Sequence, residues 1–313
     1  NAEDATGGSI QVPQGEFDAR FLSKLGGTNS VYNFVYNAYR NSLGRNLARL
    51  NGHRILVVGD THHGPRPLEG AVSYASSEPF DHLLIVNDPH HAHWFASMSL
   101  PVAGWWPSPD AGIFLQGSNW SDHREQSAVF IGQVGRWHPR RMPSIEALRR
   151  HGIHVRVAST PARIAARLYH RSEVSLNLIL NGDTNARTFE IMGSGGTLIT
   201  DRLEKQCGIG ALFTENEHYL AFDGDSELCD VVENVFRDPR RARNISLLGF
   251  DACKKEHLPT HRVEQFWNHI DRQSDALVRN LDYEPRVAAA RRAGPVPLDV
   301  LVERIRAYEF LQE

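Results

Sequence analysis

Short apolar runs recur along the chain and alternate with segments of helical periodicity. Runs bounded by turn residues are typical of strands that are buried on both faces of a parallel sheet. A helix between two such strands makes a right-handed βαβ unit, so the alternation predicts an α/β fold. The runs are residues 54–59, 82–87, 101–105, 128–132, 153–157, 174–179, 196–200 and 219–222. The helical segments are residues 67–77, 90–98, 143–151, 161–169, 226–236 and 298–311, with a further helix beginning at Thr188.

The alternation is interrupted at residues 107–126, which are rich in Pro, Gly, Ser and Asp and are predicted to form a hinge. A chain of 313 residues is long enough for two domains. The sequence therefore predicts two Rossmann-like domains that face a cleft. Residues 17–50 show helical periodicity, which predicts two helices separated by Gly26 and Gly27. The predicted organisation is a flexible arm at 1–16, an N-terminal domain at 17–115, a C-terminal domain at 116–280, and a helical segment at 281–313 that can cross back to the first domain.

Charge and composition exclude several classes of protein. The net charge of -3, from 34 basic and 37 acidic side chains, gives no basic field for nucleic acid. No stretch approaches the roughly 18 apolar residues of a transmembrane segment. The sequence has no signal peptide pattern and only three cysteines, which favours a reducing, cytoplasmic location.

The segment NARTFEIMGSGGTLITD, residues 185–201, has the features of an anion site. Thr188 is a suitable N-cap for a helix that follows a strand, and the N-terminus of a helix attracts phosphate. Arg187 adds a positive charge beside that position, and Glu190 can accept hydrogen bonds from ribose hydroxyl groups. A capped core helix that ends at glycine would have the same spacing, so this alternative stays open. A basic patch of Arg136, His138, Arg140 and Arg141 follows the run at 128–132 and also favours phosphate.

Residues from about 128 to 267 resemble the C-terminal domain of group-1 glycosyltransferases with the GT-B fold, and are most similar to the CgeB-like branch. The similar elements are VFIGQVGRWHPRR, IHVRV, LYHRSEVSLNL, NARTFEIMGSGGTLITD, HYLAFDGDSELCDVVENVFRDPRRARNI and HRVEQFW, in that order. The resemblance implies a nucleotide-sugar donor bound to the second domain, with no metal and no cofactor besides this co-substrate. The donor-binding residues that it indicates are Gly132, Arg136, Asp183, Asn185, Arg187, Thr188 and Glu190.

One position departs from the family pattern. Many retaining members carry two glutamates in this segment, and Glu190 matches the second of them. Gly182 stands where the first would be, with Asp183 beside it. The departure leaves open whether the sugar is transferred with retention or inversion.

Two histidine-rich loops, GDTHHG at 59–64 and NDPHHAH at 87–93, follow the first two predicted strands. Histidine is suited to general base catalysis because its pKa lies near neutral pH. The loops contain enough ligands for zinc or manganese, but adjacent histidines on a loop are expected to point apart, and no metal site is predicted. Several of these histidines can instead cap helices or bond the backbone. The catalytic candidates are Asp60, His62, His63, Asp88 and His91.

These features predict a metal-independent glycosyltransferase that moves a sugar from a nucleotide-sugar donor to a glycan, lipid-linked or protein acceptor. A first alternative is a metallophosphoesterase, because the Asp60/His62 loop looks like the opening motif of that class. The later Gly-Asp-x-x-Asp and Gly-Asn-His-Asp/Glu elements of that class are not found in the sequence. A second alternative is an epimerase or a non-catalytic nucleotide-sugar-binding module, because fold does not settle function.

Overall fold

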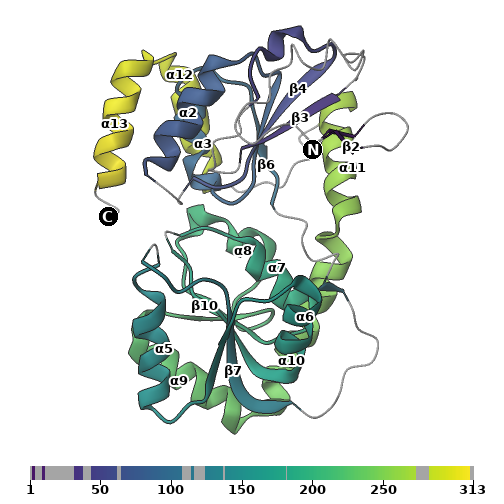
Figure 1. The fold of residues 1–313 in the computed structure, drawn as a ribbon, viewed down its shortest axis with the longest axis vertical. Coiled ribbons are helices and arrows are strands. Elements are labelled where there is room, and N and C mark those ends of the chain that lie inside the picture. The colour runs from purple at the N-terminus through teal and green to yellow at the C-terminus, as the bar shows by residue number, and fades with distance from the viewer. Residues whose placement is uncertain are drawn as a thin grey trace. The chain divides into compact units, whose positions relative to one another are not determined.

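A computed structural model describes residues 2–3, 9–10, 32–37, 44–61, 65–107, 114–115, 124–136, 138–180, 182–272 and 282–310. The chain forms two compact units (Figure 1). The first unit comprises Asn1–Trp106 together with Leu277–Glu313, and the second is Pro107–Ala276. The second unit thus starts with the Pro- and Gly-rich segment at 107–126.

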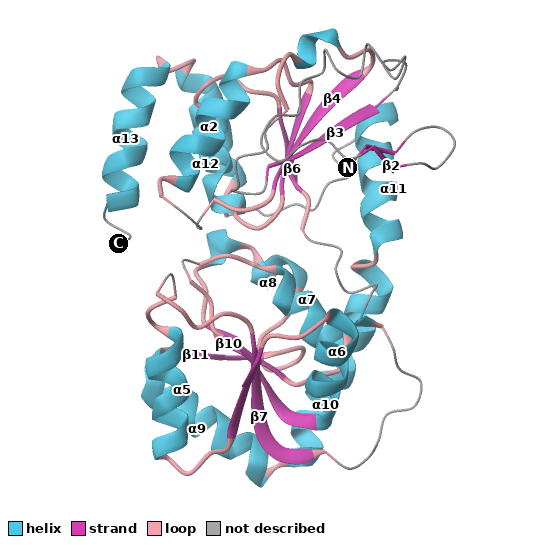
Figure 2. Cartoon of the chain, viewed as in Figure 1, coloured by secondary structure: helices cyan, strands magenta, loops and turns pink. Residues whose placement is uncertain are grey.

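The first unit contains a four-stranded sheet in the order β3-β4-β5-β6, with all neighbours parallel. Figure 2 shows the helices, strands and loops of the described residues. The strands are β3 (Tyr32–Asn37), β4 (His53–Val58), β5 (His82–Ile85) and β6 (Val102–Trp105). The helices are η1 (Leu47–Arg49), α2 (Pro67–Ser77), η2 (Pro89–His91), α3 (Ala92–Ala96), α12 (Glu284–Ala293) and α13 (Leu298–Phe310). A short antiparallel pair, β1 (Ala2–Glu3) and β2 (Ser9–Ile10), lies outside this sheet.

The prediction of helix within residues 17–50 is wrong at Tyr32–Asn37, whereas Leu47–Arg49 forms a short 3-10 helix. Tyr32–Asn37 is strand β3, which pairs in parallel with β4 from Tyr32 beside His53 to Asn37 beside Val58. Aromatic and β-branched residues such as Phe34 and Val35 suit a pleated sheet. Pairing with a buried neighbouring strand outweighs the local helical spacing, which is a weak preference by comparison. The rest of the predicted helices, at 17–31 and 38–43, lies outside the described residues.

The last helices of the chain pack on the first unit. Helix α12 contacts α3, and α13 contacts α2. Leu301 and Ile305 of α13 are almost fully buried. On the same interface Arg306 binds both carboxylate oxygens of Glu69 at 2.8 and 2.9 Å. The segment Leu277–Glu313 therefore completes the unit that the first hundred residues begin.

The second unit contains a five-stranded parallel sheet in the order β11-β10-β9-β7-β8. The apolar runs of the sequence predict each of these strands to within a few residues. The strands are β7 (Glu125–Ile131), β8 (Val155–Ala158), β9 (Ser172–Asn177), β10 (Leu198–Asp201) and β11 (Leu220–Phe222). The helices are α5 (Arg141–Arg150), α6 (Ala162–Arg171), α7 (Ala186–Gly193), η3 (Lys205–Cys207), α8 (Ile209–Leu212), α9 (Gly224–Arg237), α10 (Pro239–Glu256) and α11 (Pro259–Arg272).

Helices cover both faces of this second sheet. One core joins Phe130 of β7 to Leu148 of α5 and Val232 of α9. The other joins Val129 of β7 to Phe189 of α7. Side chains of successive strand residues point to opposite faces, so a strand that is apolar throughout supplies both cores. Cys207, Cys229 and Cys253 are buried in the second unit and form no disulfide with one another. No helix among the described residues is long and apolar enough to cross a membrane.

Candidate functional site

The carboxyl ends of the central strands form one edge of the second sheet. Strand β7 ends at Ile131, β9 ends at Asn177, and β10 ends at Asp201. In open α/β sheets, ligands bind at this edge, beyond the strand ends. The predicted donor-binding residues all lie on the segments that leave these strands.

Arg187 lies across this edge and is held on several sides. Its Nε donates to the Ile131 carbonyl at 2.8 Å, and Nη1 donates to Asn177 Oδ1 at 2.9 Å. The guanidinium carbon lies 5.0 Å from the centroid of the Phe130 ring, which adds a cation–π contact. Its Nη2 lies against Gly132, where a Cβ atom would stand only 2.5 Å away. The Gly132 φ of +156° also disfavours any side chain, so glycine is required here.

Asn177 connects the end of β9 to the start of α7. It is fully buried, and its Nδ2 donates to Thr188 Oγ1 at 3.2 Å. Thr188 is not the N-cap that the sequence predicts, because α7 begins at Ala186 and Asn185 is the N-cap. Asn185 directly precedes the helix and has an extended backbone, with a ψ of 170°. Its side chain makes no capping hydrogen bond. Thr188 is consequently enclosed in the first turn, with no solvent exposure.

A second arginine is buried beside Arg187. Arg141 donates to the Leu178 carbonyl through Nε and to the Gln133 carbonyl through Nη1, both at 2.9 Å. Burial, and after it the charge of Arg187, lowers the pKa of Arg141 to about 10, although Asp183 and Asp201 oppose the shift. Two guanidinium groups so close in a protected place create a positive potential at the strand ends.

Asp201 balances part of this charge. It forms an ion pair with Arg140 and accepts a hydrogen bond from the Ile179 N–H at 2.7 Å. Burial nevertheless raises the pKa of Asp201 above its usual range. The carboxylate fixes the loop that follows β9, where Gly182 and Asp183 lie.

The remaining predicted donor residues occupy different environments. Arg136 is exposed on the loop after β7, and Asp183 is buried near Arg141. Asn185 Oδ1 is buried and has no hydrogen-bond partner among the described residues. Glu190 is half-buried on α7, and both it and Arg187 act on Tyr169, whose pKa is raised by burial.

Four residues at this edge were not predicted as site residues. Arg141 appeared in the sequence only as part of the basic patch. Asn177 is a polar residue inside the apolar run at 174–179, and Asp201 directly follows the run at 196–200; these positions are the signals that could identify them. Tyr169 gives no comparable signal, because it lies in an ordinary helical pattern. The unassigned residues are Arg141, Tyr169, Asn177 and Asp201.

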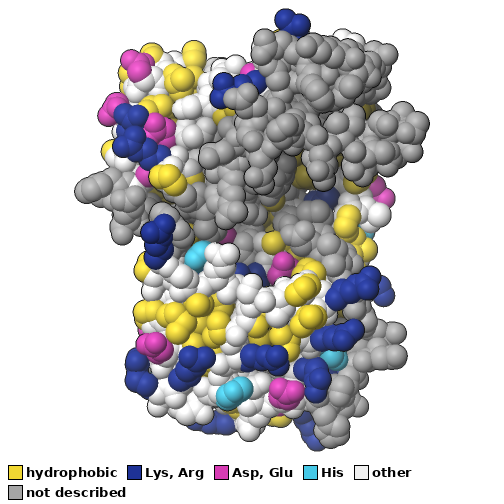
Figure 3. Space-filling view, viewed as in Figure 1, with side chains coloured by type: hydrophobic (Ala, Val, Ile, Leu, Met, Phe, Trp, Pro, Cys, Tyr) yellow, Lys and Arg dark blue, Asp and Glu magenta, His cyan; other side chains and the backbone are white. Residues whose placement is uncertain are grey.

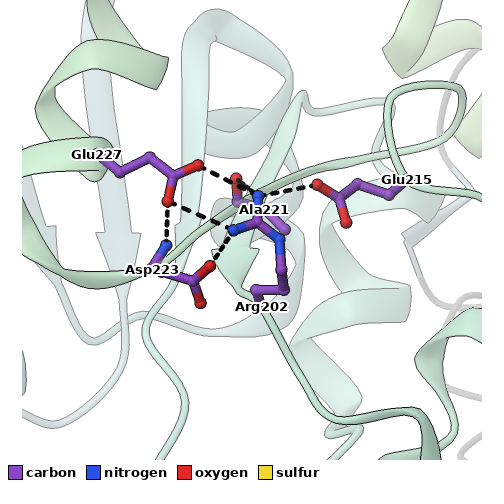
Figure 4. A network of polar contacts seen from close by, with 5 residues as sticks. All are labelled: Arg202, Glu215, Ala221, Asp223 and Glu227. Carbon is purple, nitrogen blue, oxygen red and sulfur yellow. Dashed lines mark hydrogen bonds and ion pairs between the residues drawn. The ribbon is translucent and has the colours of Figure 1, made fainter.

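Arg202, the residue after β10, forms ion pairs with three carboxylates. Its guanidinium binds the carboxylates of Glu215 at 3.0 Å and Glu227 at 3.2 Å, and it also pairs with Asp223 (Figure 4). A further hydrogen bond to the Ala221 carbonyl joins it to β11. These carboxylates raise the pKa of Arg202 and compensate its charge. The contacts tie β10 to the edge strand and to α9, so Arg202 is not a candidate for binding an anionic ligand.

In the first unit, four side chains form a continuous hydrogen-bonded series. The Thr61 hydroxyl donates to Asp88 Oδ2 at 2.6 Å and lies 2.7 Å from His91 Nδ1. His91 Nε2 lies 2.9 Å from the Tyr308 hydroxyl of α13. Because the Thr61 proton is given to Asp88, His91 donates to Thr61 through Nδ1 and accepts from Tyr308 through Nε2. For a neutral imidazole, this arrangement selects the tautomer with the proton on Nδ1.

The catalytic candidates of the first unit are not equally available to a substrate. Asp88 and His91 are each only 2% exposed, and both ring nitrogens of His91 are engaged. Asp60 is half-buried at the end of β4. His62 and His63 lie outside the described residues. Tyr308, half-buried on α13, is the more accessible end of the series and was not predicted.

The expectation that adjacent histidines point apart is wrong for His90 and His91. Their ring centroids are 4.1 Å apart, and both residues belong to the short helix η2. With Asp88 they offer ligand atoms that lie within 4.8 Å of one another, a spacing that a metal ion could use. A metal bound to His91 would have to replace its hydrogen bond to Thr61 or to Tyr308.

His93, two residues after His91, has a pKa that is lowered by burial. The pKa of His93 is lowered to about 4 by burial and by the charge of Arg286. His93 Nδ1 lies 2.8 Å from the His90 carbonyl, to which it donates. At neutral pH His93 is therefore an uncharged side chain that fixes the turn and not a proton acceptor.

Comparison with solved structures defines the class of fold. Each similarity below has a TM-score of 0.54. Anabaena HepE, solved with UDP-glucose, is 11% identical over 81% of this chain and 81% of its own. Sucrose-phosphate synthase of Thermosynechococcus elongatus is 10% identical over 82% and 77%. S. aureus TarM, solved with UDP, is 10% identical over 80% and 57%. The two parallel α/β units thus have the GT-B fold of glycosyltransferases.

Most of the second unit matches a single protein family. Residues 117–268 match the family described as glycosyl transferase-like. A search of curated protein sequences finds no match to the chain. The chain spans 53% and 52% of the length of two further similar structures, the GtfA/B complex and the pneumococcal O-GlcNAc transferase GtfA.

Proposed function

We propose that this chain is a glycosyltransferase that moves a sugar from a nucleotide-sugar donor to an acceptor hydroxyl. The observation that carries the proposal is the fixed Arg187 at the start of α7, on the carboxyl edge of the family-matched unit. A pre-oriented cation beside the N-terminus of a helix is suited to a diphosphate. Because the Arg187 side chain is already ordered, little conformational entropy is lost when the diphosphate binds. The same order lowers the reorganisation energy needed to stabilise negative charge in the transition state.

The donor is proposed to lie along this edge with its diphosphate over the first turn of α7. Arg187 and the loop at Gly132 face the phosphates, and Arg136 can approach from solvent. Glu190 is the proposed partner of the ribose hydroxyl groups, with Asn185 Oδ1 as a further acceptor. The structures of HepE and TarM hold UDP or UDP-glucose, which makes UDP the first nucleotide to try.

Transfer is proposed to proceed without a metal ion. When the sugar–phosphate bond breaks, negative charge grows on the departing diphosphate. Arg187, the helix N-terminus and the potential of Arg141 are positioned to stabilise that charge, which is the task that a metal performs in other sites. We expect sugar transfer to persist in the presence of EDTA.

The acceptor is proposed to bind the first unit, over Asp60–His63 and Asp88–His93. Because His91 is enclosed, the acceptor proton would pass to Tyr308 while the Tyr308 proton passes to His91 Nε2. Asp88, acting through Thr61, stabilises the resulting positive charge on His91. His62 and His63 remain candidates for a more direct role.

The donor site is tested with Glu190→Ala. Loss of the ribose contact should weaken UDP binding about tenfold, as expected for hydrogen bonds to a carboxylate. The measurement is isothermal titration calorimetry with UDP. Glu264→Ala is the matched control, because Glu264 is exposed on α11 and is not one of the proposed donor residues. Equal affinity of the wild type and Glu190→Ala for UDP would place the donor elsewhere.

The close spacing of the ligand atoms of Asp88, His90 and His91 supports a second candidate function, that of a metal-dependent phosphoesterase acting at these residues. Elemental analysis of purified protein, together with hydrolysis of p-nitrophenyl phosphate with and without added zinc or manganese, separates the two. Stoichiometric metal and metal-dependent hydrolysis would favour the phosphoesterase. Nucleotide-sugar binding without turnover on any acceptor would instead favour a binding module.

A further inference from the structure

Three metal-ligating side chains lie close together in the first unit. Asp88, His90 and His91 each offer a ligand atom, and these atoms all lie within 4.8 Å of one another. All three residues are buried, at 2%, 6% and 2% exposure. Ligand atoms about 2 Å from a zinc ion stand about 3.5 Å apart, so small side-chain rotations bring all three onto one ion.

The kinds of ligand favour a transition metal. Imidazole nitrogen binds zinc well, whereas magnesium and calcium prefer oxygen ligands. Asp88 supplies the one negative charge of the three ligands, and a buried charge attracts a cation more strongly than an exposed one. The Thr61 N–H and hydroxyl both donate to Asp88 Oδ2, at 3.0 and 2.6 Å, and so orient the carboxylate. Partners of this kind are typical of metal-ligating carboxylates.

His91 belongs to the hydrogen-bonded series as well as to this cluster. Its Nδ1 lies 2.7 Å from the Thr61 hydroxyl, and its Nε2 lies 2.9 Å from the Tyr308 hydroxyl. A ring nitrogen that binds a metal carries no proton and uses the lone pair with which it would accept a hydrogen bond. A metal ion and the series therefore compete for the same side chain.

Either choice of nitrogen breaks the series. If zinc takes Nε2, the Tyr308 hydroxyl loses its acceptor. If zinc takes Nδ1, the proton of the neutral ring moves to Nε2, which then donates to Tyr308 instead of accepting from it. In both cases His91 no longer receives a proton from Tyr308.

We propose that Asp88, His90 and His91 bind zinc, and that the bound ion switches off sugar transfer by withdrawing His91 from the series. The second half of this proposal rests on the proposed function, in which the acceptor proton passes to Tyr308. The ion is an inhibitor here and not a catalytic metal. The chain that EDTA has freed of metal is the active form.

Zinc binding is measured by calorimetric titration of the metal-free full chain with zinc chloride, without nucleotide. One zinc ion per chain should bind, and magnesium chloride should give no heat of binding. His90→Ala should weaken zinc binding about tenfold or more, since even loss of a supporting partner costs that much. His90→Cys restores a ligand and should regain tight binding, which separates lost coordination from lost folding.

Histidines elsewhere on the molecule require a control. The sequence has 16 of them, and Figure 3 shows histidine side chains on the visible face of the second unit. His154→Ala removes an exposed histidine of that unit and should leave the zinc affinity of this site unchanged.

The switch is measured as release of UDP from UDP-glucose, with water as the acceptor. Zinc should inhibit the wild type, and EDTA should restore the rate. In His90→Ala, the zinc concentration that halves the rate of that protein should rise by the same factor as the dissociation constant. A common factor ties inhibition to this site, because zinc bound to the nucleotide itself would inhibit both proteins alike.

Absence of zinc binding, equal zinc affinity in the wild type and His90→Ala, or a reaction that zinc accelerates would each overturn the proposal. Zinc binding without nucleotide and UDP release without zinc are measured separately. No release of UDP by the metal-free chain therefore contradicts the proposed function, whereas undiminished release by the zinc-saturated chain contradicts the switch.

Discussion

At the scale of single residues, Gly132 and Arg187 are the most closely interdependent pair of the candidate donor site. The guanidinium occupies the volume that a side chain at position 132 would need. It is fixed there by the Ile131 carbonyl, by Asn177 and by the Phe130 ring. Any residue with a Cβ atom at position 132 has to displace the arginine or distort the loop.

Gly132→Ala should therefore affect binding as well as stability. The backbone conformation and the overlap together should cost about 2 kcal/mol of folding free energy, and displacement of Arg187 should weaken UDP binding about tenfold. Calorimetry with UDP and thermal unfolding measure the two effects. Gly135→Ala on the same loop is the control, since a Cβ there meets no atom within 4 Å. Similar results for both variants would show that Arg187 adapts freely.

The Tyr308 hydroxyl is expected to take part in proton transfer from the acceptor. Tyr308→Phe removes the hydroxyl group that is hydrogen-bonded to His91 Nε2 but keeps the aromatic ring at position 308. If the series moves the acceptor proton, kcat should fall about tenfold or more while the affinity for UDP is unchanged. Tyr32→Phe, on β3 of the same unit, is the control. A Tyr308→Phe enzyme with full kcat would remove the series from the mechanism.

At the scale of elements, α13 connects the end of the chain to the loops of the first unit. Its buried face carries Leu301 and Ile305, and Glu309 accepts a hydrogen bond from the Leu68 N–H at 2.8 Å. The same face brings Tyr308 to His91. The helix is consequently both a structural cover for α2 and the support of a candidate functional group.

Ile305→Ala should loosen this helix. Removing a fully buried isoleucine costs about 3 kcal/mol, and the loss should be local because α13 is terminal in its unit. Hydrogen exchange followed by mass spectrometry should show faster exchange across Leu298–Phe310. Val300→Ala on the same helix, at a side chain that is 41% exposed, is the control and should leave exchange unchanged. Protection that survives in Ile305→Ala would mean that polar contacts alone hold the helix.

The elements differ in how far the sequence predicts them. Apolar runs identify the strands of the two sheets apart from β3, because most residues of β4, β5, β7, β9 and β10 are buried. Pro67 marks the start of α2. The edge strand β3 is missed because only its pairing with β4 distinguishes it from a helix. The start of α7 is misplaced because Asn185 and Thr188 are both suitable caps. The tertiary partners of Arg141, His91 and Tyr308 come from distant parts of the chain, so no local pattern indicates them.

At the scale of the whole molecule, buried histidines set a limit on stability in acid. The pKa of His257 is lowered to about 3 by burial and by the charge of Arg262. Arg262 Nη2 donates to His257 Nδ1 at 2.6 Å, and the histidine rests against Phe213. The unfolded chain binds a proton near pH 6.5 but the folded chain does not, so stability is full above that value. It falls as the pH decreases toward the folded pKa.

Between pH 7 and pH 5 the His257 contribution should amount to a loss of about 2 kcal/mol. His257→Asn keeps an acceptor for Arg262 but does not titrate, so its stability should fall less over the same interval. Scanning calorimetry of both proteins at the two pH values measures the difference. His154→Asn, at an exposed position, should behave as the wild type. Identical losses in the wild type and His257→Asn would show that other groups govern acid unfolding.

The order in which the units become complete follows from where α12 and α13 belong. Domains fold as units during synthesis, the amino-terminal one usually first. In this chain the ribosome finishes the second unit, Pro107–Ala276, before it has made the segment that covers α2 and α3. At that stage α12 and α13, which pack on α3 and α2 of the first unit, have not yet been synthesised. An inserted unit can thus reach its native state while the one that was begun earlier is still exposed to chaperones.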